Sequence, residues 1–152
     1  MKQDHNYFMG VALKQAQKSL ETGNLPVGSV IVKAGTLIGE GRNVVNSRID
    51  PTAHAEMMAI RNACSNLRTI DLSGCICYTT VEPCPMCCWA ILEAGIKQLV
   101  IGARFFGLKK VKVGNFSVEK LLDMTGRQLE IIDGIMVKDC TEIRNTWFDQ
   151  IK

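Results

Sequence analysis

The chain has 152 residues, of which 47% are hydrophobic and 22% are charged, so we expect one globular domain over residues 1–152. The net charge of +3 is too small to establish a nucleic-acid partner, and no apolar run approaches the roughly 20 residues of a membrane span. Seven cysteines without an apolar signal core favour reduced thiols in a cytoplasmic protein that does not enter a membrane.

The first half of the chain alternates between helical and strand patterns. Apolar periodicity predicts a helix over about residues 7–21, and two short strands within 27–43 predict a hairpin that turns at residues 33–35. Residues 46–52 are rich in Asn, Ser, Asp and Pro, which is typical of a loop. The helix predicted next, over residues 54–64, has an apolar face made of Met57, Ile60, Ala63 and Cys64.

The second half continues the alternation. We expect strands at 75–80, 97–103 and 127–133, and helices at 85–94, 118–125 and 137–151, with Pro85 in the first turn of its helix. Residues 104–115 fit no regular pattern. Alternating strands and helices predict an α/β sheet covered on both faces, and the helices that begin near residues 54 and 85 are expected to converge on one edge.

Cys84 and Cys87 have the spacing of two metal ligands on one helix face. Backbone N–H groups at a helix start lower a thiol's pKa and favour the thiolate that binds metal. His54 supplies a third ligand, because His5 lies near a terminus that we expect to be mobile. One His and two Cys leave the fourth tetrahedral position open for water, as in catalytic zinc sites, so we predict one Zn²⁺ per chain.

Glu56 lies two residues beyond His54, within reach of a zinc-bound water. It can take a proton from that water and pass it on, as general base and then acid. Each residue alone also has a purely structural explanation. The combination of HxE with PCxxC 30 residues later is far more specific, and it is the pattern of zinc-dependent base deaminases.

Cys88 lies four residues beyond Cys84 and leaves an alternative open. As a fourth ligand it would close the site to water, which predicts a non-catalytic, zinc-stabilised binding module. We interpret Cys88 instead as a small apolar neighbour. A redox pair formed by Cys84 and Cys87 is a third possibility. The remaining cysteines occupy positions that we expect to be buried, namely Cys64, Cys75, Cys77 and Cys140.

Four blocks of the sequence resemble the cytidine deaminase superfamily. They are "PVGSVIVKAGTLIGEGRN", "DPTAHAEMMAIRNA", "CYTTVEPCPMCCWAILEAGI" and "VIGAR", and the branch they resemble contains tRNA adenosine deaminases, guanine deaminases and small cytosine deaminases. The resemblance implies a three-layer α/β/α sandwich with a central mixed five-stranded sheet, usually assembled as a dimer or larger oligomer, and we expect a homodimer. It also implies zinc ligation by His54, Cys84 and Cys87, with Glu56 as the proton shuttle.

The same resemblance implies two substrate contacts. Asn43 matches the residue that hydrogen-bonds the base or its sugar, and Ala55 would donate its backbone N–H to the ring. At the C-terminus, Trp147, Phe148 and Asp149 are similar to the lid of small free-base deaminases. The "GAxGS" segment and basic tail common in tRNA adenosine deaminases are missing. We therefore expect a free base or nucleoside of guanine or cytosine type as substrate, with release of ammonia.

A basic segment without acidic residues, from Lys97 to Asn115, supports a different substrate. It interleaves cations with aromatic rings, an arrangement that can track phosphates and stack bases. The alternative is thus a tRNA-specific adenosine deaminase that forms inosine at the anticodon wobble position. Its predicted RNA contacts are Arg104, Lys109, Lys110 and Lys112.

Overall fold

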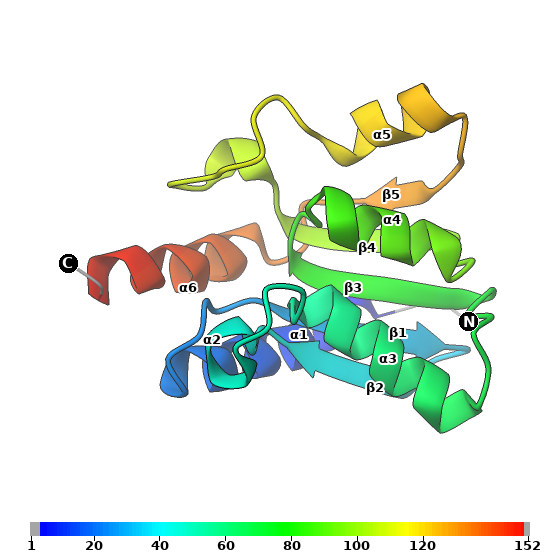
Figure 1. The fold of residues 1–152 in the computed structure, drawn as a ribbon, viewed down its shortest axis with the longest axis horizontal. Coiled ribbons are helices and arrows are strands. Elements are labelled where there is room, and N and C mark those ends of the chain that lie inside the picture. The colour runs from blue at the N-terminus through cyan, green and yellow to red at the C-terminus, as the bar shows by residue number, and fades with distance from the viewer. Residues whose placement is uncertain (1–3, 151–152) are drawn as a thin grey trace.

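A mixed five-stranded sheet forms the centre of the computed structural model, which describes residues 4–150 (Figure 1). The strand order is β2-β1-β3-β4-β5. Strand β1 is antiparallel to β2 and β3, whereas β3, β4 and β5 run parallel. The bounds are β1 Gly28–Lys33, β2 Thr36–Arg42, β3 Cys75–Val81, β4 Gln98–Ala103 and β5 Glu130–Ile132. This confirms the expected mixed sheet.

Helices cover both faces of the sheet and complete the predicted three layers. Helices α1 (His5–Glu21) and α6 (Val137–Gln150) pack on one face, and α3 (Ala55–Leu67) and α4 (Pro85–Glu93) on the other. Helix α5 (Val118–Thr125) lies beside α4 (Figure 1). No helix within residues 4–150 is long and apolar enough to cross a membrane. The last predicted residue of the terminal helix, Ile151, lies outside the described residues.

The central strands are buried on both faces, so their successive side chains enter two separate cores. In β1, Val30 and Val32 join the core beneath α1, while Ile31 joins the core beneath α3 and α4. Strand β4 divides in the same way, with Val100 on the α1 side and Leu99 on the other. This is why these strands read as nearly continuous apolar runs.

Helix α3 lies unusually close to β2 because the strand presents glycines to it. A Cβ atom at Gly41 would lie 2.3 Å from the carbonyl oxygen of Ala55 and from the amide nitrogen of Ala59. The buried face of α3 is therefore built from Ala55, Ala59 and Ala63. Of the predicted face, Ala63 is buried, and Ile60 and Cys64 are half-buried and pack against the same core, whereas Met57 is half-buried and does not belong to it.

Residues 46–52 differ from the expected loop because they include part of a single helical turn, α2 (Val45–Arg48). The side chain of Asn24 stabilises this turn, since its Oδ1 accepts hydrogen bonds from the backbone N–H of Asn46 at 2.9 Å and of Ser47 at 3.1 Å. The capping residue is more than 20 positions away, so local sequence does not reveal it. The segment then returns through Asp50 to the start of α3.

Candidate active site

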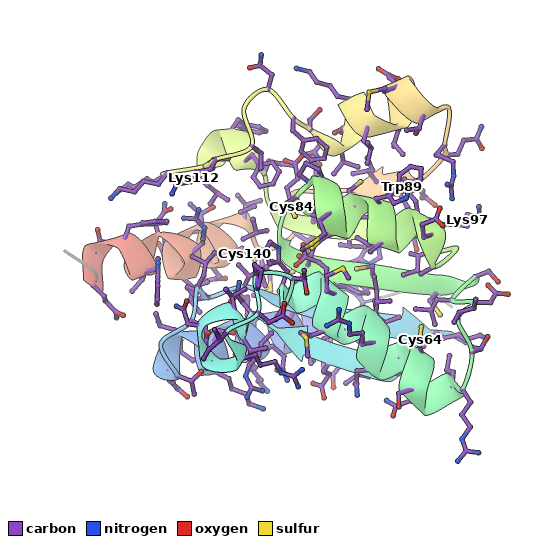
Figure 2. The ribbon with its side chains drawn as sticks, viewed as in Figure 1. Cys64, Cys84, Trp89, Lys97, Lys112 and Cys140 are labelled. Carbon is purple, nitrogen blue, oxygen red and sulfur yellow. The ribbon has the colours of Figure 1, made fainter. Side chains whose placement is uncertain are left out.

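Two helix starts meet at the edge of the sheet where β2, β3 and β4 end, as the sequence predicted. His54 is the N-cap residue of α3 and Cys84 is the N-cap residue of α4, both with extended backbone. Pro85 occupies the first helical position and fixes the entry of α4. Figure 2 shows Cys84 at this start, near the middle of the molecule. The helix starts thus place side chains of the types that bind metal and free backbone N–H groups side by side.

The nitrogen and sulfur atoms at these helix starts form a compact group. His54 Nδ1 lies 3.6 Å from Cys84 Sγ and 3.5 Å from Cys87 Sγ, and all three atoms lie within 4.8 Å of one another. Tetrahedral zinc with ordinary Zn–N and Zn–S bonds gives an N···S edge of about 3.6 Å. The donor types and their spacing therefore fit Zn²⁺. Within residues 4–150 this is the one such group of three.

The pKa values of Cys84, Cys87 and His54 are shifted because these side chains contact one another. A hydrogen bond from Cys87 lowers the pKa of Cys84 to about 4, and His54 acts in the same direction. The pKa of Cys87 is raised, because this thiol keeps the shared proton and is buried. Hydrogen bonding to Cys84 raises the pKa of His54. Without metal the two sulfurs thus share one proton, which zinc binding would displace.

Glu56 lies in the first turn of α3 and is only 4% exposed. Burial raises the pKa of its carboxyl to about 7, and the negative charge of Cys84 contributes to the increase. A carboxyl group with a pKa near neutrality can both accept and return a proton. The structure therefore places a buried carboxyl group with a pKa near neutrality beside the three clustered donor atoms.

A cavity of about 420 Å³ opens over this group, a volume in the usual range for small ligands. Two predicted substrate-contact residues line it, Asn43 directly after β2 and Ala55 at the start of α3. The Oδ1 of Asn43 accepts a hydrogen bond from the N–H of Val45 at 3.1 Å. That bond orients the side-chain amide, so its NH₂ group is the end available to a ligand.

The predicted lid is only partly placed at the cavity. Trp147 and Phe148 line it from α6 and are half-buried. Asp149 is exposed and does not belong to the cavity wall. The two aromatic side chains therefore remain candidates for contacting a substrate, whereas the acidic residue faces solvent.

The predicted basic segment divides into one internal cation and three exposed ones. Arg104 is paired with three carboxylates, at 3.5 Å from Glu82, 3.1 Å from Asp133 and in contact with Glu119. The ion pairs do not support its expected role in contacting RNA, since three carboxylates of the chain already neutralise its charge. The exposed members are Lys109, Lys110 and Lys112, of which the last two line the cavity. Figure 2 shows Lys112 on the segment above α6.

Two further residues in the cavity wall were not predicted. Glu82 is 4% exposed, and its carboxylate accepts hydrogen bonds from the N–H groups of Phe105 and Val118. Arg144 on α6 is 6% exposed, with its guanidinium group 4.4 Å from the ring centroid of Phe148. An acid directly after a buried strand and before PCxxC could have indicated Glu82. No sequence signal indicated Arg144, which lies in a largely polar helix.

The remaining cysteines and His5 lie away from the group. Cys88 is fully buried in the core between α4 and the sheet and is not one of the three clustered donors. Cys75, Cys77 and Cys140 are buried as expected, but Cys64 is only half-buried. His5 was expected in a mobile terminus, yet it begins α1 and its Nδ1 lies 2.8 Å from the hydroxyl of Tyr78.

Comparison with known proteins places this geometry among deaminases. The family model described as the cytidine and deoxycytidylate deaminase zinc-binding region matches residues 2–103. A tRNA-specific adenosine deaminase from Aquifex aeolicus is 44% identical over 117 residues, which are 77% of this chain and 75% of the relative. The tRNA-specific adenosine deaminase of Buchnera aphidicola subsp. Schizaphis graminum is 38% identical and covers 94% of this chain and 93% of its own length.

A solved structure supports the same relationship over the whole fold. It comes from a study of A-to-I editing by tRNA:A34 deaminases at the wobble position of transfer RNA. It has a TM-score of 0.80 and 33% sequence identity, and it covers 90% of this chain and 98% of the other. The relatives contradict the expected free-base or nucleoside substrate. That expectation rested partly on an acidic lid residue, Asp149, which lies outside the cavity, whereas Lys110, Lys112 and Arg144 line it.

Proposed function

The chain belongs to the cytidine and deoxycytidylate deaminase family, and we propose that it converts adenosine to inosine at the wobble position of a tRNA anticodon. The family match and relatives make it a zinc-dependent hydrolytic deaminase. One observation carries the choice of substrate: four relatives with 33–44% identity, each matching 77–100% of the chain, are named tRNA-specific adenosine deaminases.

His54, Cys84 and Cys87 would hold the zinc ion, because their atoms have the types and spacing of a tetrahedral site. When bound, zinc lowers the pKa of a water molecule so that a hydroxide nucleophile forms near neutral pH. With three protein ligands, the ion would remain accessible to that water. The position of Cys88 in the core cluster, outside the group of three donors, supports an open site over a closed structural one.

Glu56 performs the proton transfers in this proposal. It accepts a proton from the attacking water and delivers it to N1 of adenine as the C6–O bond forms. The hydroxyl group on C6 then gives up its proton, which Glu56 passes to the amino nitrogen; the C6–N bond breaks, the C6 carbonyl forms and ammonia leaves. Because Glu56 is almost fully buried, bulk water is largely kept from its carboxyl group.

Asn43 and Ala55 orient the substrate. The backbone N–H of Ala55 belongs to the first turn of α3 and has no partner within the helix, so it can donate a hydrogen bond to the ring. The NH₂ group of Asn43 can donate to the ribose. At the cavity mouth, Trp147 and Phe148 offer rings for stacking neighbouring bases, while Lys110 and Lys112 supply positive charge.

The test is inosine formation in an anticodon stem–loop with adenosine at the wobble position, followed by mass spectrometry. The zinc-loaded protein should form inosine there and leave an otherwise identical stem–loop with adenosine only at other positions unchanged. Glu56→Gln should lower the rate at least about 100-fold with zinc retained. Turnover of guanine or cytosine without turnover of the stem–loop would refute the proposal.

The proposal includes one zinc ion per chain and a cytoplasmic homodimer. The single group of three donors within residues 4–150 supports the metal stoichiometry. Trp89, 40% exposed on α4, offers an apolar contact for a second copy (Figure 2). Metal analysis of the purified protein would measure the number of zinc ions per chain, and light scattering would measure the number of chains per assembly.

A further inference from the structure

Arg144 is a buried cation for which the described residues supply no complete set of partners. It extends from α6 into the cavity wall, and its Nη1 atom is buried without a hydrogen-bond partner among residues 4–150. The side chain is 6% exposed and its guanidinium group stacks on Phe148. Buried polar groups are nearly always hydrogen-bonded, because desolvation without a partner is costly. The group therefore calls for an acceptor from outside the chain.

The surroundings of Arg144 indicate that this acceptor is an anion. Lys110 places its Nζ 5.3 Å from the centroid of Phe148, so two cations contact one ring. Lys112 lines the same cavity. The carboxylate of Glu82, also in the wall, is occupied by Arg104 and by two backbone N–H groups. Like charges gathered this closely repel one another, and a bound anion would relieve that repulsion.

We propose that Arg144, together with Lys110, binds the phosphate group that adjoins the nucleoside whose base reaches Glu56. This inference rests on the proposed function and adds a specific phosphate contact to it. A guanidinium group matches phosphate through two parallel N–H···O bonds, and stacking on Phe148 fixes its plane. Exposed Lys109 attracts phosphates without fixing their position, whereas buried Arg144 can select one.

Phosphate of this kind has two sources, an internal phosphodiester of RNA and the terminal phosphate of a mononucleotide. Both present the same oxygens to the guanidinium group. The RNA source is the one that the proposed function implies. The measurements therefore include stem–loop RNA, 5′-AMP and inorganic phosphate as separate ligands.

The decisive experiment is a scan of single phosphates. Each phosphate of the anticodon loop is replaced in turn by an uncharged methylphosphonate, and affinity is measured for zinc-loaded Glu56→Gln protein, which binds without turnover. We expect one linkage next to the target adenosine whose replacement weakens binding about tenfold or more. In the Glu56→Gln, Arg144→Met double variant, the same replacement should change affinity less than twofold.

Arg127 provides the matched control. It too stacks on an aromatic ring, with its guanidinium carbon 5.2 Å from the centroid of Trp89, but it is more exposed and does not line the cavity. When Arg127→Met is added to Glu56→Gln protein, each methylphosphonate replacement should change RNA affinity by the same factor as it does without Arg127→Met. If Arg144→Met remains as sensitive as the parent at every linkage, the inference is wrong.

Stability separates phosphate binding from a structural role. Removing a buried charge that lacks partners should leave Tm unchanged or raise it, whereas a structural arginine predicts a fall in Tm on Arg144→Met. If Arg144→Met does not fold, Arg144→Lys provides the comparison. It keeps the charge but loses the two-pronged geometry, so the tenfold effect at the selected linkage should shrink.

The ligands distinguish failure of this inference from failure of the proposed function. If the protein forms inosine but Arg144→Met does not alter the effect of any uncharged linkage on affinity, the proposed function is supported and the phosphate subsite is refuted. Suppose instead that the stem–loop is neither bound nor deaminated, but 5′-AMP or phosphate binds in an Arg144-dependent manner. That result would support the phosphate subsite and refute the RNA substrate. If no ligand depends on Arg144, the inference is overturned.

Discussion

Arg104 forms an ion pair with Glu82, with Nη1 of the arginine 3.5 Å from Oε2 of the glutamate. Arg104 follows β4 and Glu82 follows β3, so the pair joins two neighbouring strand ends beside the cavity. The Glu82 carboxylate also accepts hydrogen bonds from the N–H of Phe105 at 3.0 Å and of Val118 at 3.1 Å. One buried side chain thereby fixes both ends of the segment that carries the exposed lysines.

Glu82→Gln should lower the free energy of unfolding by about 3 kcal/mol, because it removes one partner of a largely buried pair and leaves Arg104 with less compensation. Urea unfolding would measure the change. Glu93→Gln is the control, since it breaks a pair with Arg127 in which both side chains are more than a third exposed. It should cost less than about 1 kcal/mol. Equal losses in the two variants would contradict this account of Glu82.

Gly41→Ala should destabilise the protein and disturb zinc binding. The new Cβ would lie 2.3 Å from backbone atoms of Ala55 and Ala59, so α3 would have to move, and His54 with it. Gly10→Ala is the matched control, because a Cβ there meets nothing within 4 Å and the residue lies inside α1. That change should stabilise by about 0.5–1 kcal/mol. Thermal melting and zinc analysis would test this: Tm and zinc content should fall in Gly41→Ala, whereas Tm should rise in Gly10→Ala.

Cys84→Ser should lose most of the bound zinc, whereas Cys88→Ala should retain it. Cys84 contributes one of the three clustered donors, but Cys88 lies in the core and should cost only about 1 kcal/mol of stability when shortened. Elemental analysis after dialysis would give zinc per chain for both. Loss of zinc from Cys88→Ala would instead support a closed, structural site.

Reversal of three exposed lysines to glutamate should abolish deamination of the stem–loop. Log affinity decreases with log salt concentration, and if all three lysines contact phosphates, the steepness of this decrease should be smaller by about 2 in the variant. The variant changes Lys109, Lys110 and Lys112. The control changes three exposed lysines outside the cavity, Lys14, Lys18 and Lys33, and thus alters net charge by the same amount. A similar loss in the control would assign the effect to net charge.

Trp147→Ala should raise KM for the stem–loop by about tenfold or more, because loss of a base-stacking ring costs 1–3 kcal/mol. Asp149→Asn should change KM less than twofold, since Asp149 is exposed and does not line the cavity. Steady-state inosine formation would give both values. An effect of Asp149→Asn as large as that of Trp147→Ala would restore the acidic residue to the predicted lid.

The amino-acid sequence by itself predicted the sheet, the two helix starts and the donors that gather there. These features depend on short-range patterns, such as the spacing of Cys84 and Cys87 within one helical turn. The same holds for Glu56, which follows His54 by two residues in the first turn of α3. Ala34 and Gly35 form the hairpin turn with positive φ angles, as the turn position implied.

Only the tertiary structure decided which charges are available to a ligand. Arg104 and Arg144 are both arginines near the cavity in a weakly charged sequence, yet Arg104 forms ion pairs with three carboxylates, whereas Arg144 forms none with any residue that the structure describes. The physical reason is that ion pairing and burial depend on which distant segments meet. Sequence patterns report the periodicity of one element, whereas the partners of Arg104 come from α5 and from the residues that follow β3 and β5.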